Sequence, residues 1–408
     1  MTSSPRLVKS AFTDITHKAA TIKEIPVDRD LGMTRTDRLY IIGHADGLEL
    51  NSPMQVVSLQ DIVTYLGADT SSPLLRATFD AYNEGARDIW IVAAAPMSEY
   101  IADISNRNTS LVSLGNQTFY QLYYSRLATT YEILREYSEP EILLPVEAPF
   151  YYTAGVDFLT QLADHCADAF NNTGRIRLGI IGTRIGTHTT TEVSDMATDA
   201  RLTTVKNSQG GMFVSIIGGE VSVSHPQIST AYSISASTPA AARLSTLRMN
   251  MGLIHRSMDT AISPTYKEYD QSEYSELAIA GVNWIKRSRL GQRGVPYQVY
   301  TETDNILSSS ASSIWSIAHV RIMSKVVNKI QAMGSIRIGT VGYPKFRHSV
   351  IAYMERLKNA GLLKGYNLKI YRDEVDPYKV IVDVNIRPFG TLREVFLSIA
   401  VGNTSTAR

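Results

Sequence analysis

The one cysteine of the chain, Cys166, has an adjacent histidine, His165, and the two have the chemistry of a covalent nucleophile and its base. A cysteine attacks as its thiolate, so a catalytic pair needs the imidazole to face the sulfur. A helix is predicted here, and adjacent residues on a helix point about 100° apart. The two side chains therefore do not face each other, and Cys166 is interpreted as a buried structural thiol.

Other sequence motifs for catalysis are missing. The sequence has no Gly-Lys-Ser/Thr phosphate loop, His-Glu-x-x-His, Gly-x-Ser-x-Gly or paired cysteines, and its eight histidines show no metal-ligand spacing. The glycines of residues 179–186 miss the dinucleotide-binding spacing and are interpreted as turn glycines. We predict no catalytic residue, no cofactor and no metal, and a hydrolase-like α/β enzyme is the least favoured function.

The charges are unevenly distributed along the chain. Residues 315–372 contain eleven Lys and Arg and one acid, Glu355, which gives +10; the whole chain carries +1, so the remainder carries −9. Copies of such a chain can pair their opposite poles, or the basic pole can bind an acidic partner. The near-zero total charge does not oppose self-association.

Two groups of these bases have helical spacing. One predicted helix has a base at every fourth position, which gives a stripe of Arg321, Lys325 and Lys329. The next helix turns its basic residues mostly away from its apolar arc; they are Lys345, Arg347, His348, Arg356 and Lys358. Three interpretations remain: a solvated face, a nucleic-acid-binding surface, or a surface for an acidic protein. The few aromatic residues among these bases disfavour nucleic acid.

The elements before this basic region alternate between strand and helix. The buried strands are predicted at 39–43, 89–96, 142–146, 176–182 and 213–219. The helices are predicted at 59–65, 74–82, 119–134, 158–170, 192–205 and 240–257, and short strands follow at 283–286 and 296–300. This order predicts a three-layer α/β domain with a largely parallel sheet over residues 31–307. Outer decorations are expected near 97–140 and 260–300.

Residues 308–390 are predicted to form a small α+β domain. The expected order is a helix that stops at Gly334, a strand at 336–340, a helix that begins at Pro344 and ends at Gly361, and two alternating strands. Residues 1–30 and 391–408 are interpreted as extended arms. The apolar strand 395–401 either completes its own domain's sheet or joins a neighbouring copy.

The compartment is also constrained by the sequence. A single cysteine excludes an intrachain disulfide and fits a reducing environment. The N-terminus lacks the apolar core of a signal peptide, and no run approaches the roughly 18 apolar residues of a membrane helix. We therefore expect a soluble protein that is made inside the cell and has no membrane partner.

Three features together resemble the contractile tail sheath proteins of phages, pyocins and related injection machines. The first is YNEGARDIWIVAAAP within residues 74–96, and the second is the α/β centre. The third and most specific covers residues 310–402, with AHVRIMSKVV, FRHSVIAYMERLKNAGLLKGYNLKIYRDE and YKVIVDVNIRPFGTLREVFLSIAV.

The resemblance implies a structural subunit in a helical array of six-fold rings around an inner tail tube protein, with baseplate and tail terminator proteins as further partners. Contraction drives the tube through a cell envelope without ATP. The helix 344–360 would face the tube through its basic residues. The arms would add strands to neighbouring subunits through Val8, Phe12, Val395, Phe396, Leu397, Ile399 and Val401. Assembly would occur in the bacterial host cytoplasm, and the mature form would lie in the virion tail or an equivalent particle.

Overall fold

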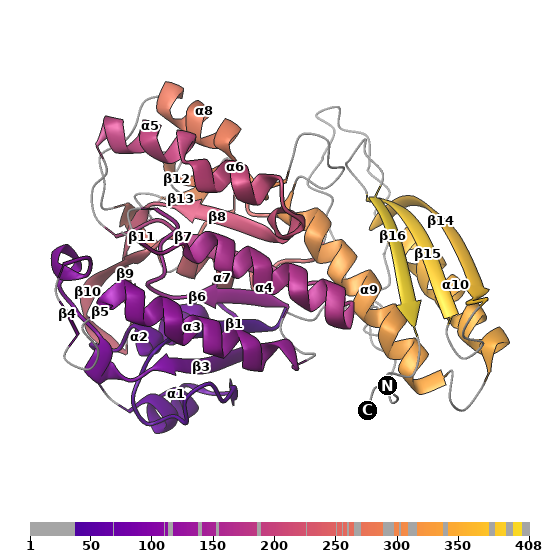
Figure 1. Cartoon of the computed structure of the whole chain (residues 1–408), viewed down its shortest axis with the longest axis horizontal. Coiled ribbons are helices and arrows are strands. Elements are labelled where there is room, and N and C mark those ends of the chain that lie inside the picture. Colours follow the sequence, from indigo (N-terminus) through magenta and orange to yellow (C-terminus); the bar gives the residue numbers. More distant parts are fainter. Residues whose placement is uncertain are drawn as a thin grey trace, which may run out of the picture.

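The computed structural model describes residues 37–401 except for 68, 110, 113–116, 138–140, 152–154, 186–188, 226, 250, 255, 259–260, 265–270, 289–297, 302, 309–315, 338–341, 375–379 and 389–394. The expected N-terminal arm, with Val8 and Phe12, lies outside the described residues. Figure 1 shows a large α/β unit and a smaller C-terminal unit, with the long helix α9 (Ile317–Arg337) between them.

An eight-stranded sheet forms the centre of the large unit, in the order β13-β12-β8-β7-β6-β1-β3-β2. The six inner strands are parallel, and the edge strands β13 and β2 are antiparallel to their neighbours. The strands are β1 (Leu39–His44), β2 (Met54–Val56), β3 (Ile89–Ala95), β6 (Ile142–Pro145), β7 (Leu178–Gly182), β8 (Val214–Gly218), β12 (Val282–Ser288) and β13 (Gln298–Thr301). The predicted α/β fold with a largely parallel sheet is confirmed.

Helices cover both faces of this sheet. In Figure 1, α3 and α4 lie in front of it, whereas α2 and α7 pack against each other on the other side. The helices are α1 (Leu59–Leu66), α2 (Pro73–Asn83), α3 (Phe119–Arg135), α4 (Phe158–Thr173), α5 (Thr190–Thr198), α6 (Ala200–Lys206), α7 (Ser237–Thr246) and α8 (Gln271–Ala280). Strands covered on both sides are apolar throughout, and all six residues of β1 are buried.

Several elements were not predicted from the sequence. A second, three-stranded antiparallel sheet consists of β9 (Glu220–His225), β10 (Ile228–Ser235) and β11 (Ala261–Pro264). The other small elements are β4 (Leu111–Val112), β5 (Gln117–Thr118) and 3₁₀ turns at Met97–Glu99, Ile104–Asn106 and Gln209–Phe213. Helix α8 was also missed, because its apolar residues do not follow a single face.

Two predicted helices have different limits in the structure. The helix expected at 192–205 is split into α5 and α6 at Asp199, whose side chain accepts a hydrogen bond from the backbone N–H of Arg201. The helix expected at 240–257 ends at Thr246. The carbonyl oxygens of Leu247 and Met251 turn instead toward the guanidinium of Arg321.

The C-terminal unit contains α10 (Tyr343–Asn359) and a three-stranded sheet in the order β14-β15-β16. Its strands are β14 (Leu363–Arg372), β15 (Val380–Pro388) and β16 (Val395–Val401). The predicted stop at Gly334 is wrong, because α9 continues to Arg337. A helix tolerates one glycine at a cost of about 1 kcal/mol when packing favours continuation. The strand expected at 336–340 begins inside α9, and its remainder lies outside the described residues.

The 3₁₀ turn Gln209–Phe213 packs so closely on α4 that a methyl group at Gly210 would overlap the backbone carbonyl of Ala163. We expect Gly210→Ala to lower the free energy of unfolding by about 1–3 kcal/mol, because the backbone must shift. Gly365→Ala is the control, since a methyl group there meets nothing within 4 Å. Urea denaturation followed by tryptophan fluorescence measures both, and equal midpoints would contradict the packing argument.

Candidate functional site: the basic C-terminal unit

Helix α10 has one apolar face and one basic face. Pro344 occupies its first turn, where a missing N–H costs no hydrogen bond, and Gly342 precedes it with a φ of 79°. The buried residues recur at helical spacing; they are Phe346, Val350, Tyr353, Met354 and Leu357. Gly361, with a φ of 72°, follows the last turn as predicted.

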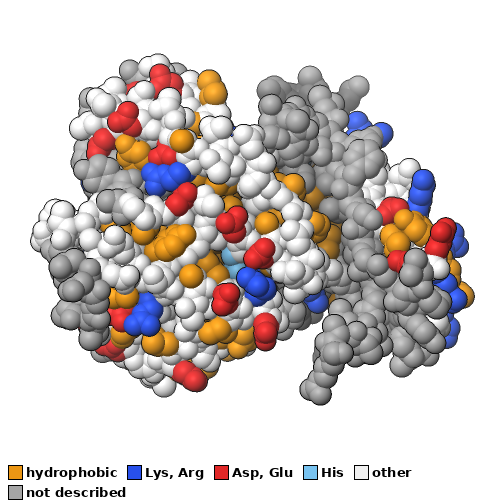
Figure 2. Space-filling view, viewed as in Figure 1, with side chains coloured by type: hydrophobic (Ala, Val, Ile, Leu, Met, Phe, Trp, Pro, Cys, Tyr) orange, Lys and Arg blue, Asp and Glu red, His pale blue; other side chains and the backbone are white. Residues whose placement is uncertain are grey.

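The opposite face of α10 presents its bases to solvent. Lys345, Arg347, His348, Arg356 and Lys358 are all exposed. The one acid of the helix, Glu355, accepts a 2.6 Å hydrogen bond from the hydroxyl of Tyr366. Figure 2 shows Lys and Arg side chains along the outer rim of the C-terminal unit. The face therefore carries an excess of positive charge, and its role in binding a tube stays a prediction.

The sheet of the C-terminal unit supports α10. Strand β15 alternates, with Val380, Val382, Val384 and Ile386 buried and the intervening residues more exposed. The hydroxyl of Tyr343 donates a 2.7 Å hydrogen bond to the carbonyl of Ile370 in β14, so the first turn of α10 is fixed to the sheet. Arg372 also lies over the ring of Tyr343, 5.3 Å from its centroid.

The C-terminal strand β16 forms where it was predicted. In this single chain it pairs antiparallel with β15 of the same chain, from Val395 opposite Ile386 to Val401 opposite Val380. This is the first of the two arrangements considered for the strand. Val395, Phe396, Leu397, Ile399 and Val401 all belong to it, and their donation to a neighbouring copy stays a prediction.

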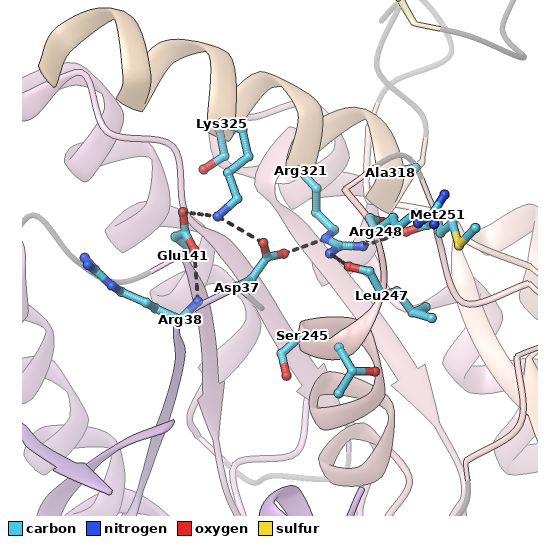
Figure 3. Close-up of polar contacts among 12 residues, drawn as sticks. Asp37, Arg38, Glu141, Ser245, Leu247, Arg248, Met251, Ala318, Arg321 and Lys325 are labelled. Atoms are coloured by element: carbon cyan, nitrogen blue, oxygen red, sulfur yellow. Dashed lines mark hydrogen bonds and ion pairs between the residues drawn. The ribbon is translucent and has the colours of Figure 1, made fainter. Parts of the chain in front are cut away.

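The basic stripe expected on α9 is not a surface feature. Arg321 is buried, and its Nε donates a 2.6 Å hydrogen bond to Asp37, which starts the described chain. The other guanidinium nitrogens donate to the carbonyl oxygens of Leu247, Arg248 and Met251 at 2.6–3.0 Å. Figure 3 shows Asp37 between the side chains of Arg321 and Lys325. The stripe prediction is therefore corrected: Arg321 is held inside the chain.

Lys325 completes this charge cluster. Its Nζ lies 3.1 Å from Asp37 and 2.5 Å from Glu141, while Glu141 also accepts the backbone N–H of Arg38. Burial disfavours the charged ammonium, but Asp37 and Glu141 outweigh it and raise the pKa of Lys325. Only Lys329 of the stripe is exposed. We call Asp37, Glu141, Arg321 and Lys325 the α9 charge cluster.

Helix α9 consequently joins the two units. Its start is fixed to the large unit by the N–H of Ile317, which donates to the carbonyl of Asp304, and Ser324 donates to the carbonyl of Ile176. The helix also packs against α10 and β16. The position of the basic face relative to the large sheet therefore depends on α9. Sequence reasoning missed Asp37 and Glu141 because no local pattern links them to α9.

We expect Asp37→Asn to lower the free energy of unfolding by about 3–5 kcal/mol, because it leaves the buried charge of Arg321 without its carboxylate. The matched control is Asp168→Asn, which breaks a solvent-exposed pair with Arg135 and is expected to cost less than about 1 kcal/mol. Urea denaturation of the two variants makes the comparison. A similar loss of unfolding free energy in both variants would show that the cluster contributes no more to stability than a surface ion pair.

The environment of Cys166 is opposite to that of a nucleophile. The thiol is fully buried, and burial raises its pKa to about 12. His165 stacks on Tyr131 with ring centroids 4.7 Å apart, and its Nε2 lies 2.8 Å from Arg177. Burial and then the charge of Arg177 lower the pKa of His165 well below its usual value. The pair is therefore part of the core, as interpreted from the sequence.

A crevice opens at the carboxyl ends of β6 and β7, where open parallel sheets commonly bind ligands. The charged residues that line it are already paired: Arg107 with Glu147, and Arg184 with Glu192. In the described part of the chain, no three His, Cys, Asp or Glu side chains are placed to hold a metal ion. No described helix is long and apolar enough to cross a membrane.

Comparison with solved structures places the fold. A sheath tail protein from Desulfitobacterium hafniense matches with a TM-score of 0.62 and 11% identity, over 94% of this chain and 100% of that one. The helical sheath of the anti-feeding prophage in its contracted state matches with a TM-score of 0.59 and 12% identity, over 96% and 99% of the two chains. The sheath complex of an extracellular contractile injection system, in its contracted state, matches with a TM-score of 0.61 and 11% identity. That match covers 95% of this chain and 98% of the other chain.

No protein-family model matches the sequence, and no curated protein matches it. The structural neighbours are nevertheless consistent, since all three are described as sheath or sheath tail proteins. The chain has the fold of contractile tail sheath proteins, and the resemblance seen in the sequence is confirmed at that level.

Proposed function

We propose that this chain is the structural subunit of a contractile tail sheath, which polymerises helically around an inner tube and contracts to drive that tube through a cell envelope. The observation that carries the proposal is the length of the structural match, which covers 94–96% of this chain and 98–100% of the sheath proteins. If this chain and the sheath proteins shared only an α/β core, the match would not extend over the C-terminal unit. Negative-stain microscopy of the purified protein tests the proposal: tubular polymers support it.

The proposed organisation follows the sheath architecture. Residues 31–307 form the α/β sheath domain, residues 308–390 the inner domain, and residues 1–30 and 391–408 the arms. The proposed partners are further copies in six-fold rings, the inner tube protein, and baseplate and terminator proteins. Assembly takes place in the bacterial host cytoplasm. Nucleic acid is a weaker candidate partner, since at least Arg321 and Lys325 of the basic region are neutralised within the chain.

The arms are proposed to link the copies. In one isolated chain, β16 covers the edge of β15 through seven register pairs. A neighbouring copy offers the same edge, so exchange of β16 between copies replaces each backbone hydrogen bond by an equivalent one. At the other side of this sheet, β14 is the edge strand of the described residues. We assign that edge to the N-terminal arm of another copy.

The exchange has a limited range. Six residues, 389–394, separate β15 from β16, and an extended chain spans at most about 3.5 Å per residue. The acceptor sheet must therefore lie within roughly 25 Å of the donor, which restricts exchange to directly adjacent subunits. A link of this length favours a closed mesh over long-range crosslinks.

We expect that tying β16 to its own chain prevents polymerisation. Asp383 and Ser398 are register partners, so cysteines at both positions, in a Cys166→Ala background, can form a disulfide between β15 and β16. The oxidised protein should stay soluble and folded but form no tubes. The same sample after reduction is the control and should polymerise. Tubes of equal length and number before and after reduction would contradict strand exchange.

The basic face of α10 is proposed to contact the tube through charge. We expect the triple variant Lys345→Glu, Arg347→Glu, Lys358→Glu to lose at least tenfold in tube affinity, because attraction becomes repulsion across exposed, screened contacts. Co-sedimentation with purified tube measures this affinity. Assembly of the variant without tube controls for the sheath contacts and should match wild type. Unchanged tube binding would reject this face as the contact.

A further inference from the structure

The chain enters its described fold at Asp37, just before β1 begins. The N–H of Asp37 donates a 3.0 Å hydrogen bond to the carbonyl of Ser245 in α7. Its carboxylate lies 2.6 Å from Arg321 and 3.1 Å from Lys325, so two successive turns of α9 hold this side chain (Figure 3). The residue to which residues 1–36 are joined is therefore fixed by α9 and α7 before the large sheet starts.

Lys325 also connects this entry point to the C-terminal unit. Its ammonium pairs with Asp37, and its backbone carbonyl accepts a 3.5 Å hydrogen bond from the hydroxyl of Tyr353 in α10. Tyr353 belongs to the buried face of α10, and only 2% of its surface is exposed. A single residue of α9 thus contacts both the start of the described chain and the helix that carries the basic face.

Asp37 and α9 cannot move separately at low cost. The side chains of Asp37 and Arg321 are only 3% and 2% exposed, so little water can reach either charge. Moving Asp37 away from α9 would leave a buried guanidinium without its carboxylate, which costs far more than the loss of a surface ion pair. A displacement of the chain at Asp37 is therefore a displacement of α9. The elements of the C-terminal unit that pack against α9 are α10 and β16.

We propose that the α9 charge cluster is a mechanical coupling, which transmits load on the N-terminal segment, residues 1–36, to α9 and to the basic face of α10. The coupling is a property of one chain. Its use in an assembly rests on the proposed function, in which another copy holds the N-terminal arm. Engagement of that arm then changes the orientation in which α10 faces the tube, and by reciprocity a contact at α10 changes the strain on the arm.

The first test makes one substitution at two positions of α9. Lys325→Met removes the ammonium between Asp37 and Glu141 but keeps the pair of Asp37 with Arg321. Lys329→Met is the matched control, one turn further along at an exposed position. In dilute, monomeric protein we expect Lys325→Met to raise amide hydrogen exchange in α9 and α10 by about fivefold or more, and Lys329→Met by less than about twofold. Mass spectrometry measures the exchange, and α2 in the same sample reports global unfolding.

Each outcome of this experiment decides the proposal. Faster exchange in α9 and α10 with unchanged exchange in α2 supports the coupling. Faster exchange in α9 alone confines the effect to one helix and rejects the transmission to α10. A similar rise in all three helices shows a general loss of stability, and no rise shows that the ammonium of Lys325 does not hold α9; either result rejects the coupling.

The second test applies load at the N-terminus. Handles are attached to residue 1 and to a cysteine introduced on the exposed side of α10 by His348→Cys, in a Cys166→Ala background. Optical tweezers measure the force of the first unfolding event. If the cluster carries the load to α10, Lys325→Met lowers this force by about a third or more, whereas Lys329→Met leaves it within about a tenth of wild type. Equal forces in wild type and Lys325→Met mean that the load bypasses the cluster, which overturns the proposal.

Both tests use the dilute monomer, so their results do not depend on tube formation. If Lys325→Met has the expected effects but the wild type forms no tubes at high concentration, the coupling stands and the sheath function is rejected. If the wild type forms tubes but Lys325→Met behaves like Lys329→Met in both tests, the sheath function stands and the coupling is rejected.

Discussion

The buried charge cluster on α9 is the interaction on which the arrangement of the two units depends. Arg321 and Lys325 enter the large unit from a helix that also packs against α10 and β16, and Asp37 and Glu141 meet them at the amino-terminal end of the parallel sheet. Burying four charges costs several kcal/mol per ion unless each is paired. Apolar packing alone is compatible with several rotations of α9 about its own axis. The guanidinium of Arg321, in contrast, donates to three carbonyls and one carboxylate in a single orientation of the helix. The cluster therefore fixes the orientation of α9 as well as its contact with the large unit.

This cluster also explains where sequence reasoning succeeded and where it failed. Helix α10 was predicted almost to the residue, because Pro344, Gly361 and the apolar spacing are local signals. The same spacing argument on α9 gave an exposed basic stripe. Asp37 lies 284 residues before Arg321, and no local pattern records that pairing. A charged residue at regular spacing is therefore ambiguous until its partner in the fold is known.

The rest of the fold also contains elements with a local sequence signal, which were predicted, and elements without one, which were missed. Five of the six parallel strands were predicted from apolar runs, since strands buried on both faces leave a continuous signal, whereas β12 was expected only as a short strand. The sheet of β9, β10 and β11 gave no such signal, because its strands pair with one another and are rich in small polar residues. The exposed face of α10 was predicted from the sequence, but the partner that binds this face could not be. Exposure follows from helical periodicity, whereas function depends on the surface that faces it in an assembly.

The C-terminal sheet connects this single-chain fold to a polymer. A three-stranded sheet whose last strand is apolar and joined by a short link is stable within one chain, and the same pairs are equally good between chains. Intrachain pairing is therefore expected in dilute solution, because its effective concentration is set by the link. Exchange becomes favourable when further contacts hold two copies together.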